Sequence, residues 1–156
     1  MAKITPNAII LFLCLALAGC AGTAAGPEFK PAAAPSGGGV IYIYALGGFA
    51  GYGEAPVFLV DGNDAGKLQN KGFLAVPVRA GAHIVTMRSV IVGLKLPGSD
   101  KTVKVGPGGS AYFRIDRKFD SMSYAGGVYT PVYINEMKQV PNGTGRKEIA
   151  QTKKSR

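Results

Sequence analysis

After position 40 the chain alternates between short apolar runs and clusters of turn-forming residues. The runs are rich in Val, Ile, Tyr and Phe, and Gly, Pro, Asn and Asp stand between them. This pattern is typical of β-strands joined by tight turns, and no longer window has a helical period. We expect strands over residues 40–45, 56–61, 73–78, 83–88, 102–105, 110–116 and 128–134.

A set of seven to eight short strands predicts an all-β fold, either a β-sandwich or a partly closed barrel. The pattern extends over residues 40–141, which is enough chain for one modest core, so we expect a small single domain. Pro77 and Pro131 fall inside two of the expected strands. Because proline cannot donate to a strand ladder, both strands are expected at sheet edges or bulges.

The first 19 residues have the pattern of a signal peptide. Lys3 precedes an apolar run over residues 8–18, which is shorter than the ~20 residues needed to span a bilayer. The segment ends in Leu17-Ala18-Gly19-Cys20, which resembles the lipobox of bacterial lipoproteins. The resemblance implies that Leu17, Ala18 and Gly19 are recognised by a signal peptidase and that Cys20 receives a lipid. The alternative is an ordinary secretory signal in which Cys20 is incidental.

Both cysteines of the chain, Cys14 and Cys20, lie in this segment. The processed chain would therefore have no disulfide framework and would depend on core burial. A lipoprotein modification would add two or three acyl chains, which is enough for stable membrane residence. Ala21 stands where many Gram-negative lipoproteins carry an Asp for inner-membrane retention. The resemblance therefore implies lipid anchorage to the outer membrane, facing the periplasm.

Residues 20–39 contain three prolines and a glycine triplet but almost no apolar periodicity. Such a composition buries too little surface to offset the entropy of ordering it, so we expect a flexible tether. Phe29 is the tether residue that could dock on the domain, although we expect it to be exposed.

The order of several structural motifs resembles a family of small bacterial lipoproteins built on a domain of unknown function. The motifs are Tyr42-Ile43-Tyr44, the Gly-rich residues 47–51, residues 57–62 ending in Val-Asp-Gly, and residues 81–83 and 111–113. Residues 57–87 are also similar to PEGA-type modules. The resemblance implies an immunoglobulin-like or transthyretin-like sandwich on a lipid anchor, and it brings no catalytic residues.

The residues offer little support for catalysis. His83 is the one histidine, so a zinc-type site would need carboxylates as its other ligands. We expect His83 to be a turn residue whose ring bonds a backbone group. Serines and the carboxylates Asp61 and Asp116 could supply a triad, but no Gly-x-Ser-x-Gly sequence surrounds any serine. We therefore predict no catalytic residues, no metal site and no cofactor.

The long Gly-rich connection at residues 47–53 is the candidate binding loop, because it carries Phe49 and Tyr52. The alternative is that its glycines only let the chain cross a sheet edge.

The formal net charge is +9, and cations are concentrated toward the C-terminus, where residues 142–156 form an expected basic tail. Beside a membrane such a tail is attracted to anionic lipid. The alternative is a solvated tail that aids solubility. Nucleic acid is not an expected partner of an exported protein.

These features favour a non-enzymatic, lipid-anchored envelope protein that binds an envelope protein or glycan. The alternatives are an outer-membrane accessory lipoprotein of a secretion machine and an enzyme acting on cell-wall glycan. The sequence leaves the partner and the oligomeric state open.

Overall fold

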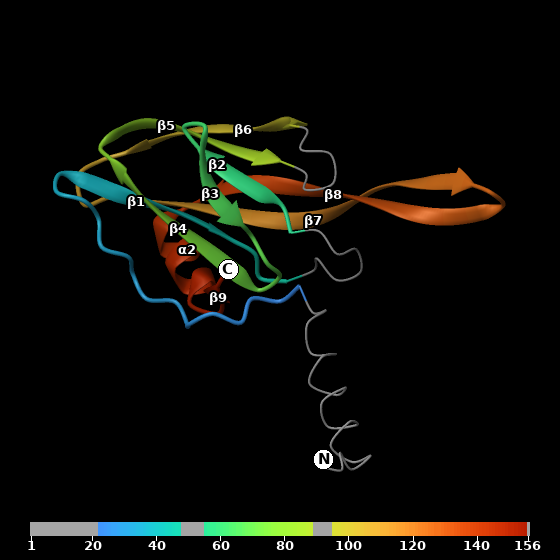
Figure 1. Cartoon of the computed structure of the whole chain (residues 1–156), viewed down its shortest axis with the longest axis horizontal. Helices are drawn as coiled ribbons and strands as arrows, with labels where there is room; N and C mark the ends of the chain where they lie inside the picture. Colours follow the sequence, from blue (N-terminus) through green and yellow to red (C-terminus); the bar gives the residue numbers. More distant parts are fainter. Residues whose placement is uncertain (1–21, 48–54, 89–94, 156) are drawn as a thin grey trace, which may run out of the picture.

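The computed structural model describes residues 22–47, 55–88 and 95–155 (Figure 1). Most of these residues belong to strands. The elements are β1 (Gly38–Tyr44), β2 (Val57–Val60), β3 (Asn63–Lys67), β4 (Gly72–Arg79), β5 (Gly81–Arg88), β6 (Lys95–Val105), β7 (Ser110–Ala125), β8 (Val128–Val140), α2 (Asn142–Ile149) and β9 (Lys153–Lys154).

Two sheets pack face to face as a small all-β sandwich, which confirms the predicted fold class (Figure 1). One sheet has the order β8-β7-β1-β4-β9 and the other has the order β3-β2-β5-β6. β1 pairs in parallel with β7 and β4 in parallel with β9, and the other pairings are antiparallel. The finer prediction of an immunoglobulin-like or transthyretin-like sandwich stays a prediction.

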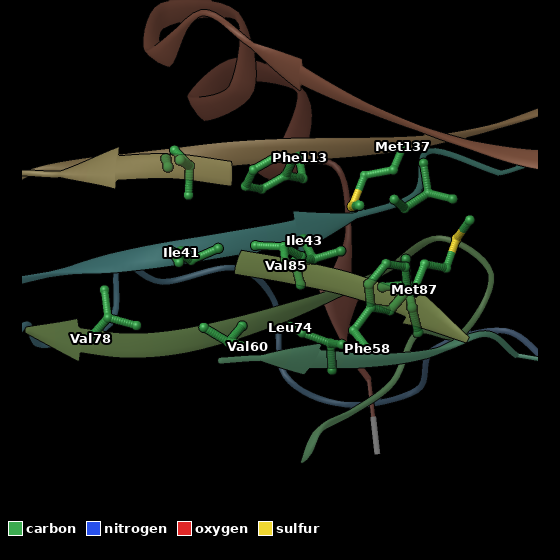
Figure 2. Close-up of a cluster of buried hydrophobic side chains, with 14 of the residues drawn as sticks. Ile41, Ile43, Phe58, Val60, Leu74, Val78, Val85, Met87, Phe113 and Met137 are labelled. Atoms are coloured by element: carbon green, nitrogen blue, oxygen red, sulfur yellow. The ribbon is translucent and has the colours of Figure 1, made fainter. Parts of the chain in front are cut away.

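The main core lies between the two sheets. Ile41, Ile43 and Phe113 of the larger sheet face Phe58 and Val85 of the smaller sheet (Figure 2). All five side chains are fully buried. Because successive residues of a strand point to opposite faces, Tyr42, between Ile41 and Ile43 in β1, faces the other way.

A second cluster covers the outer face of the larger sheet. It contains Val40, Tyr42, Tyr44, Phe73, Tyr112 and Ile149. α2 supplies Ile149, and Gly145 of the same helix lies so close to Tyr112 that an added Cβ would overlap the tyrosine side chain. β1 is therefore buried on both faces along its whole length.

The expected strands are all present, with wider bounds for several of them. Pro131 lies on β8, which is an edge strand, and Pro77 lies on β4 beyond the short stretch that pairs with β9. The prediction of an edge strand is confirmed for Pro131. It is wrong for Pro77, because β4 lies between β1 and β9, although β9 pairs only with Gly72 and Phe73 and does not reach the proline. At Asp61 and Gly62 both φ angles are positive, 52° and 81°, as a two-residue hairpin turn of type I′ requires.

The C-terminal residues differ from a solvated tail. Residues 142–149 form α2, and residues 153–154 form β9 at the edge of the larger sheet. Ile149, Thr152 and Ser155 are buried. The reason is local: one apolar residue and two small hydroxyl residues face the domain, while the cations between them remain exposed.

The segment after residue 22 also differs from the expected tether. Its backbone bridges β9 at Glu28, and Ala24 is buried. The expectation that Phe29 is exposed is wrong, because its ring packs edge-on against Tyr42 and Phe73 with centroid distances of 5.5 and 5.4 Å. Aromatic contacts of this kind supply the burial that the composition of the segment did not suggest.

Candidate functional site

β7 and β8 continue beyond the body of the sandwich as a two-stranded arm, residues 118–134 (Figure 1). β1 pairs with β7 only as far as Arg114, whereas the β7–β8 ladder continues to Ala125 and Val128. The tip is a turn through Gly126 and Gly127, whose φ angles are 60° and 83°. Two successive positive φ angles favour glycine and match the twist of a tight hairpin.

The arm holds most of the exposed large hydrophobic side chains of the described residues. Six of the eight such side chains are Phe119, Met122, Tyr124, Val128, Tyr129 and Ile134, and their exposed fractions run from 45% to 68%. The other two, Leu46 and Ile84, lie outside the arm. Because exposed apolar side chains rarely cluster in this way, the arm is the candidate interaction surface.

A β-bulge gathers the apolar residues of β7 on one face of the arm. The ladder shifts between Phe119 and Ser121, so that Asp120 is an extra residue. An insertion of one residue reverses the alternation of side chains along a strand. As a result Met122 and Tyr124 lie on the same face as Phe119, which they would not do in a regular strand.

The same face continues the core face of the larger sheet. Ile115 is buried in the main core, and Phe119 lies four residues further along the same strand. Tyr129 stands opposite Tyr124 across the ladder, and their ring centroids are 4.7 Å apart. The arm is therefore an extension of the inner sheet face into solvent.

No residue from Ser121 to Ile134 is an Asp, Glu, Lys, Arg or His. Charged side chains lie closer to the body of the sandwich, at the root of the arm. Lys138 forms ion pairs with Glu136 and Asp116 there, with N–O distances of 3.0 and 3.6 Å. Apart from its backbone, the distal arm thus consists of hydroxyl, aromatic and aliphatic side chains and the thioether of Met122.

A hydrogen-bonded network ties the root of the arm to α2. Arg114 donates two hydrogen bonds to Asp116, at 2.9 and 3.0 Å, and one to Glu148 of α2, at 3.0 Å. The Tyr44 hydroxyl donates to the other oxygen of Glu148 at 2.5 Å. Burial and this hydrogen bond raise the pKa of Tyr44 well above its usual range, so the phenol stays protonated.

His83 links the β2–β3 turn of the smaller sheet to the end of β4 in the larger sheet. One ring nitrogen lies 2.6 Å from an Asp61 carboxylate oxygen, and the other lies 2.9 Å from the carbonyl of Arg79. The second Asp61 oxygen accepts a hydrogen bond from the backbone of Ile84. The prediction that the ring bonds a backbone group is confirmed. The nitrogen that would activate a serine in a triad is occupied by that carbonyl.

Both partners of the His83 ring are acceptors, so the protonated ring satisfies both contacts. The hydrogen bond with Asp61 raises the pKa of His83, and the same bond lowers the pKa of Asp61. The raised pKa gives stability below about pH 6.5 that is lost as pH rises through the folded-state value. The lowered pKa gives stability above about pH 4 that is lost as pH falls further.

We predict that the free energy of unfolding falls between about pH 6 and pH 8.5 by roughly 0.5–1 kcal/mol, a size suited to a half-exposed carboxylate. The measurement is urea unfolding of the wild-type chain and of His83→Gln at both pH values. The free energy of unfolding of His83→Gln should fall less than that of the wild-type chain between the two pH values. An equal fall in both chains would contradict the assignment to this pair.

The residues proposed from sequence as sites lie outside the described structure. Leu17, Ala18, Gly19 and Cys20 fall in residues 1–21, and Phe49 and Tyr52 fall in residues 48–54. Within the described ranges no cluster of three His, Cys, Asp or Glu side chains could hold a metal ion. Among those same residues no helix is long and apolar enough to cross a bilayer.

The sequence interpretation missed the arm. Two β-forming pairs, Tyr124-Ala125 and Val128-Tyr129, flank Gly126-Gly127, which is a recognised hairpin signal. The residues before them, Asp120-Ser-Met-Ser123, have little β-propensity, so the expected strand stopped at residue 116.

No curated protein and no solved structure matches the chain. A family of proteins of unknown function, DUF2846, matches residues 35–128. The match covers more than half of the chain, from just before β1 to the first residue of β8. It therefore includes the smaller sheet, the strands β1, β4 and β7 of the larger sheet, and the β7 side of the arm. The chain belongs to the DUF2846 family of proteins of unknown function.

Proposed function

We propose that the chain is a non-enzymatic binding module of the bacterial cell envelope, held at the periplasmic side of the outer membrane by lipid on Cys20. The arm is its binding surface, and the partner is another envelope protein. One observation carries this proposal: the exposed apolar side chains concentrate on a hairpin that projects from the body and has no charged residue from Ser121 to Ile134 (Figure 1).

The backbone of the arm supports a protein partner. β8 is an edge strand, and beyond Arg114 β7 pairs with β8 and with no second strand among the described residues. The arm therefore presents unpaired strand edges beside its apolar face. An extended segment of a partner protein can pair with such an edge while its side chains cover the apolar face.

The distal arm has no charged side chains with which to recognise a partner. The chain as a whole has a formal charge of +9, yet residues 121–134 contribute none of it. Shape and apolar contact, rather than charge pairing, would select the partner. Aromatic side chains such as Tyr124 and Tyr129 are common anchors in interfaces of this type.

Support for the anchor comes from sequence. The apolar run at residues 8–18 and the lipobox-like Leu17-Ala18-Gly19-Cys20 together favour export and lipidation. A protein held at a membrane has a high local concentration of membrane-associated partners. At that concentration, a small hydrophobic arm can bind its partner even when the area of contact is modest.

The test is chemical crosslinking in Gram-negative cells that express the full chain, followed by purification from membranes. Cys20→Ser is the unanchored control. We expect the wild-type chain to carry acyl chains by intact mass and to yield a reproducible crosslinked protein, and we expect the control to lack both. Unmodified Cys20, or recovery of the monomer alone from the membrane fraction, would contradict the proposal.

A further inference from the structure

The first described residues of the chain, from Gly22, are hydrogen-bonded to Asn70, just before β4 of the larger sheet. The backbone of Asn70 donates to the carbonyl of Gly22 at 2.7 Å, and Ala24 donates to the carbonyl of Asn70 at 2.8 Å. Gly22 follows Cys20 by two residues. Two residues span at most about 7 Å, so Gly22 lies within that distance of the cysteine.

Three lysines surround this place. Lys153 donates from its backbone to the carbonyl of Lys71 at 3.0 Å, and Gly26 donates to the carbonyl of Lys154 at 3.2 Å. Lys71, Lys153 and Lys154 are all exposed. We call this set the lysine edge.

The lysine edge carries a local excess of positive charge. Glu28, whose backbone bridges Lys153, is the acidic residue placed beside it by the sheet pairing. None of the three lysines forms an ion pair within the part of the chain that the structure describes. Three exposed ammonium groups against one carboxylate leave a cationic surface.

We propose that the lysine edge contacts the anionic headgroups of the membrane in which the lipid on Cys20 is inserted. The inference rests on the proposed anchorage. Gly22 follows the anchored residue by two positions, and Lys71 follows Asn70, the residue that bonds Gly22. This connection holds the lysine edge near the membrane surface, whose charge acts over a Debye length of about 8 Å at physiological salt. Each lysine near an anionic surface adds to the attraction.

This contact would orient the domain. β9, which carries two of the lysines, forms one edge of the larger sheet, and β8 of the arm forms the opposite edge. A membrane contact at the lysine edge therefore turns the β8 edge away from the bilayer. The arm is then free to meet a periplasmic partner.

The test uses the processed chain from residue 20 with Cys20→Ser, so that no acyl chain contributes. Its binding is measured by sedimentation with phosphatidylcholine vesicles, with and without phosphatidylglycerol. The variant is Lys71→Gln/Lys153→Gln/Lys154→Gln. The matched control, Arg88→Gln/Lys101→Gln/Lys104→Gln, removes the same charge from exposed positions on the smaller sheet.

We expect binding to the anionic vesicles only, weakened by added salt. The lysine-edge variant should bind about a hundredfold more weakly, and the control variant should stay within a fewfold of the parent. Equal losses in the two variants, or equal binding to neutral vesicles, would overturn the inference. Thermal unfolding of both variants checks that they remain folded. Because the vesicles contain no protein and the chain no lipid, failure here is distinct from failure of the anchor or of the arm.

Discussion

Replacing Met122, Tyr124 and Tyr129 with serine is expected to lower recovery of the crosslinked partner at least a hundredfold. Each of these side chains is more than half exposed in the free chain. In a protein interface, truncation of a central aromatic residue costs about 2 kcal/mol or more. Loss of the two tyrosines together with Met122 is therefore expected to weaken the affinity for the partner by more than two orders of magnitude. The measurement is quantitative recovery of the partner from crosslinked membranes.

The same variant should stay folded. The three residues bury little surface in the free chain, and the Tyr124–Tyr129 contact contributes only about 0.5–1 kcal/mol to the arm itself. The matched control is Leu46→Ser/Ile84→Ser, which removes the exposed large hydrophobic side chains found outside the arm in the described residues. Loss of recovery in the control to the same degree, or full recovery with the arm variant, would contradict the assignment.

Phe113→Ala is expected to lower the free energy of unfolding by about 3–5 kcal/mol. Phe113 is fully buried between the two sheets, where it packs with residues of both (Figure 2). Removing the ring leaves a cavity that a close-packed interior fills only in part. The measurement is urea unfolding followed by circular dichroism.

Phe119→Ala provides the comparison on the same strand. The Phe119 side chain is 51% exposed, so its truncation should cost less than about 1 kcal/mol. A large loss from Phe119→Ala would mean that the arm is part of the cooperative core. A small loss from Phe113→Ala would mean that the sheets do not pack as described.

The sandwich was predictable because its strands carry their own signals. Runs such as Val40-Ile-Tyr-Ile-Tyr44 and Pro56-Val-Phe-Leu-Val60 have the β-branched and aromatic residues of buried strands, and turn residues separate them. Pro131 also predicted an edge strand correctly, because the missing N–H excludes proline from a central ladder. Pro77 did not, because β4 lies between β1 and the short β9.

The ends of the chain were not predictable in the same way. Residues 142–149 contain two glycines and only one large apolar residue, so their composition does not indicate a helix. The helix is stabilised by tertiary contacts: Ile149 is buried, and Glu148 bonds Tyr44 and Arg114 of two strands distant in sequence. Phe29 likewise docks on aromatic rings that no local pattern relates to it.

The candidate site could not be predicted from the sequence either. A long Gly-rich loop with Phe49 and Tyr52 is a reasonable sequence-based choice, because loops often carry recognition. The arm instead depends on a bulge at Asp120, which places Met122 and Tyr124 on one face. A bulge is a property of the pairing between two strands, and one strand's sequence does not reveal it.

The two proposed contact surfaces, the arm and the lysine edge, lie at opposite edges of the larger sheet. The arm strands form one edge of the larger sheet, and β9 forms the other. One edge is apolar toward its tip and the other is cationic. A lipid-anchored module with these two edges would lie on its membrane through one edge and reach a partner through the other.

The most direct test of the central claim is site-specific photocrosslinking in cells. A photoreactive amino acid is placed at position 129 on the arm or at position 84 on β5, both exposed in the free chain. If the arm is the binding surface, the probe at Tyr129 gives a discrete adduct with an envelope protein and the probe at Ile84 gives none. An adduct from position 84 with none from position 129 would contradict it.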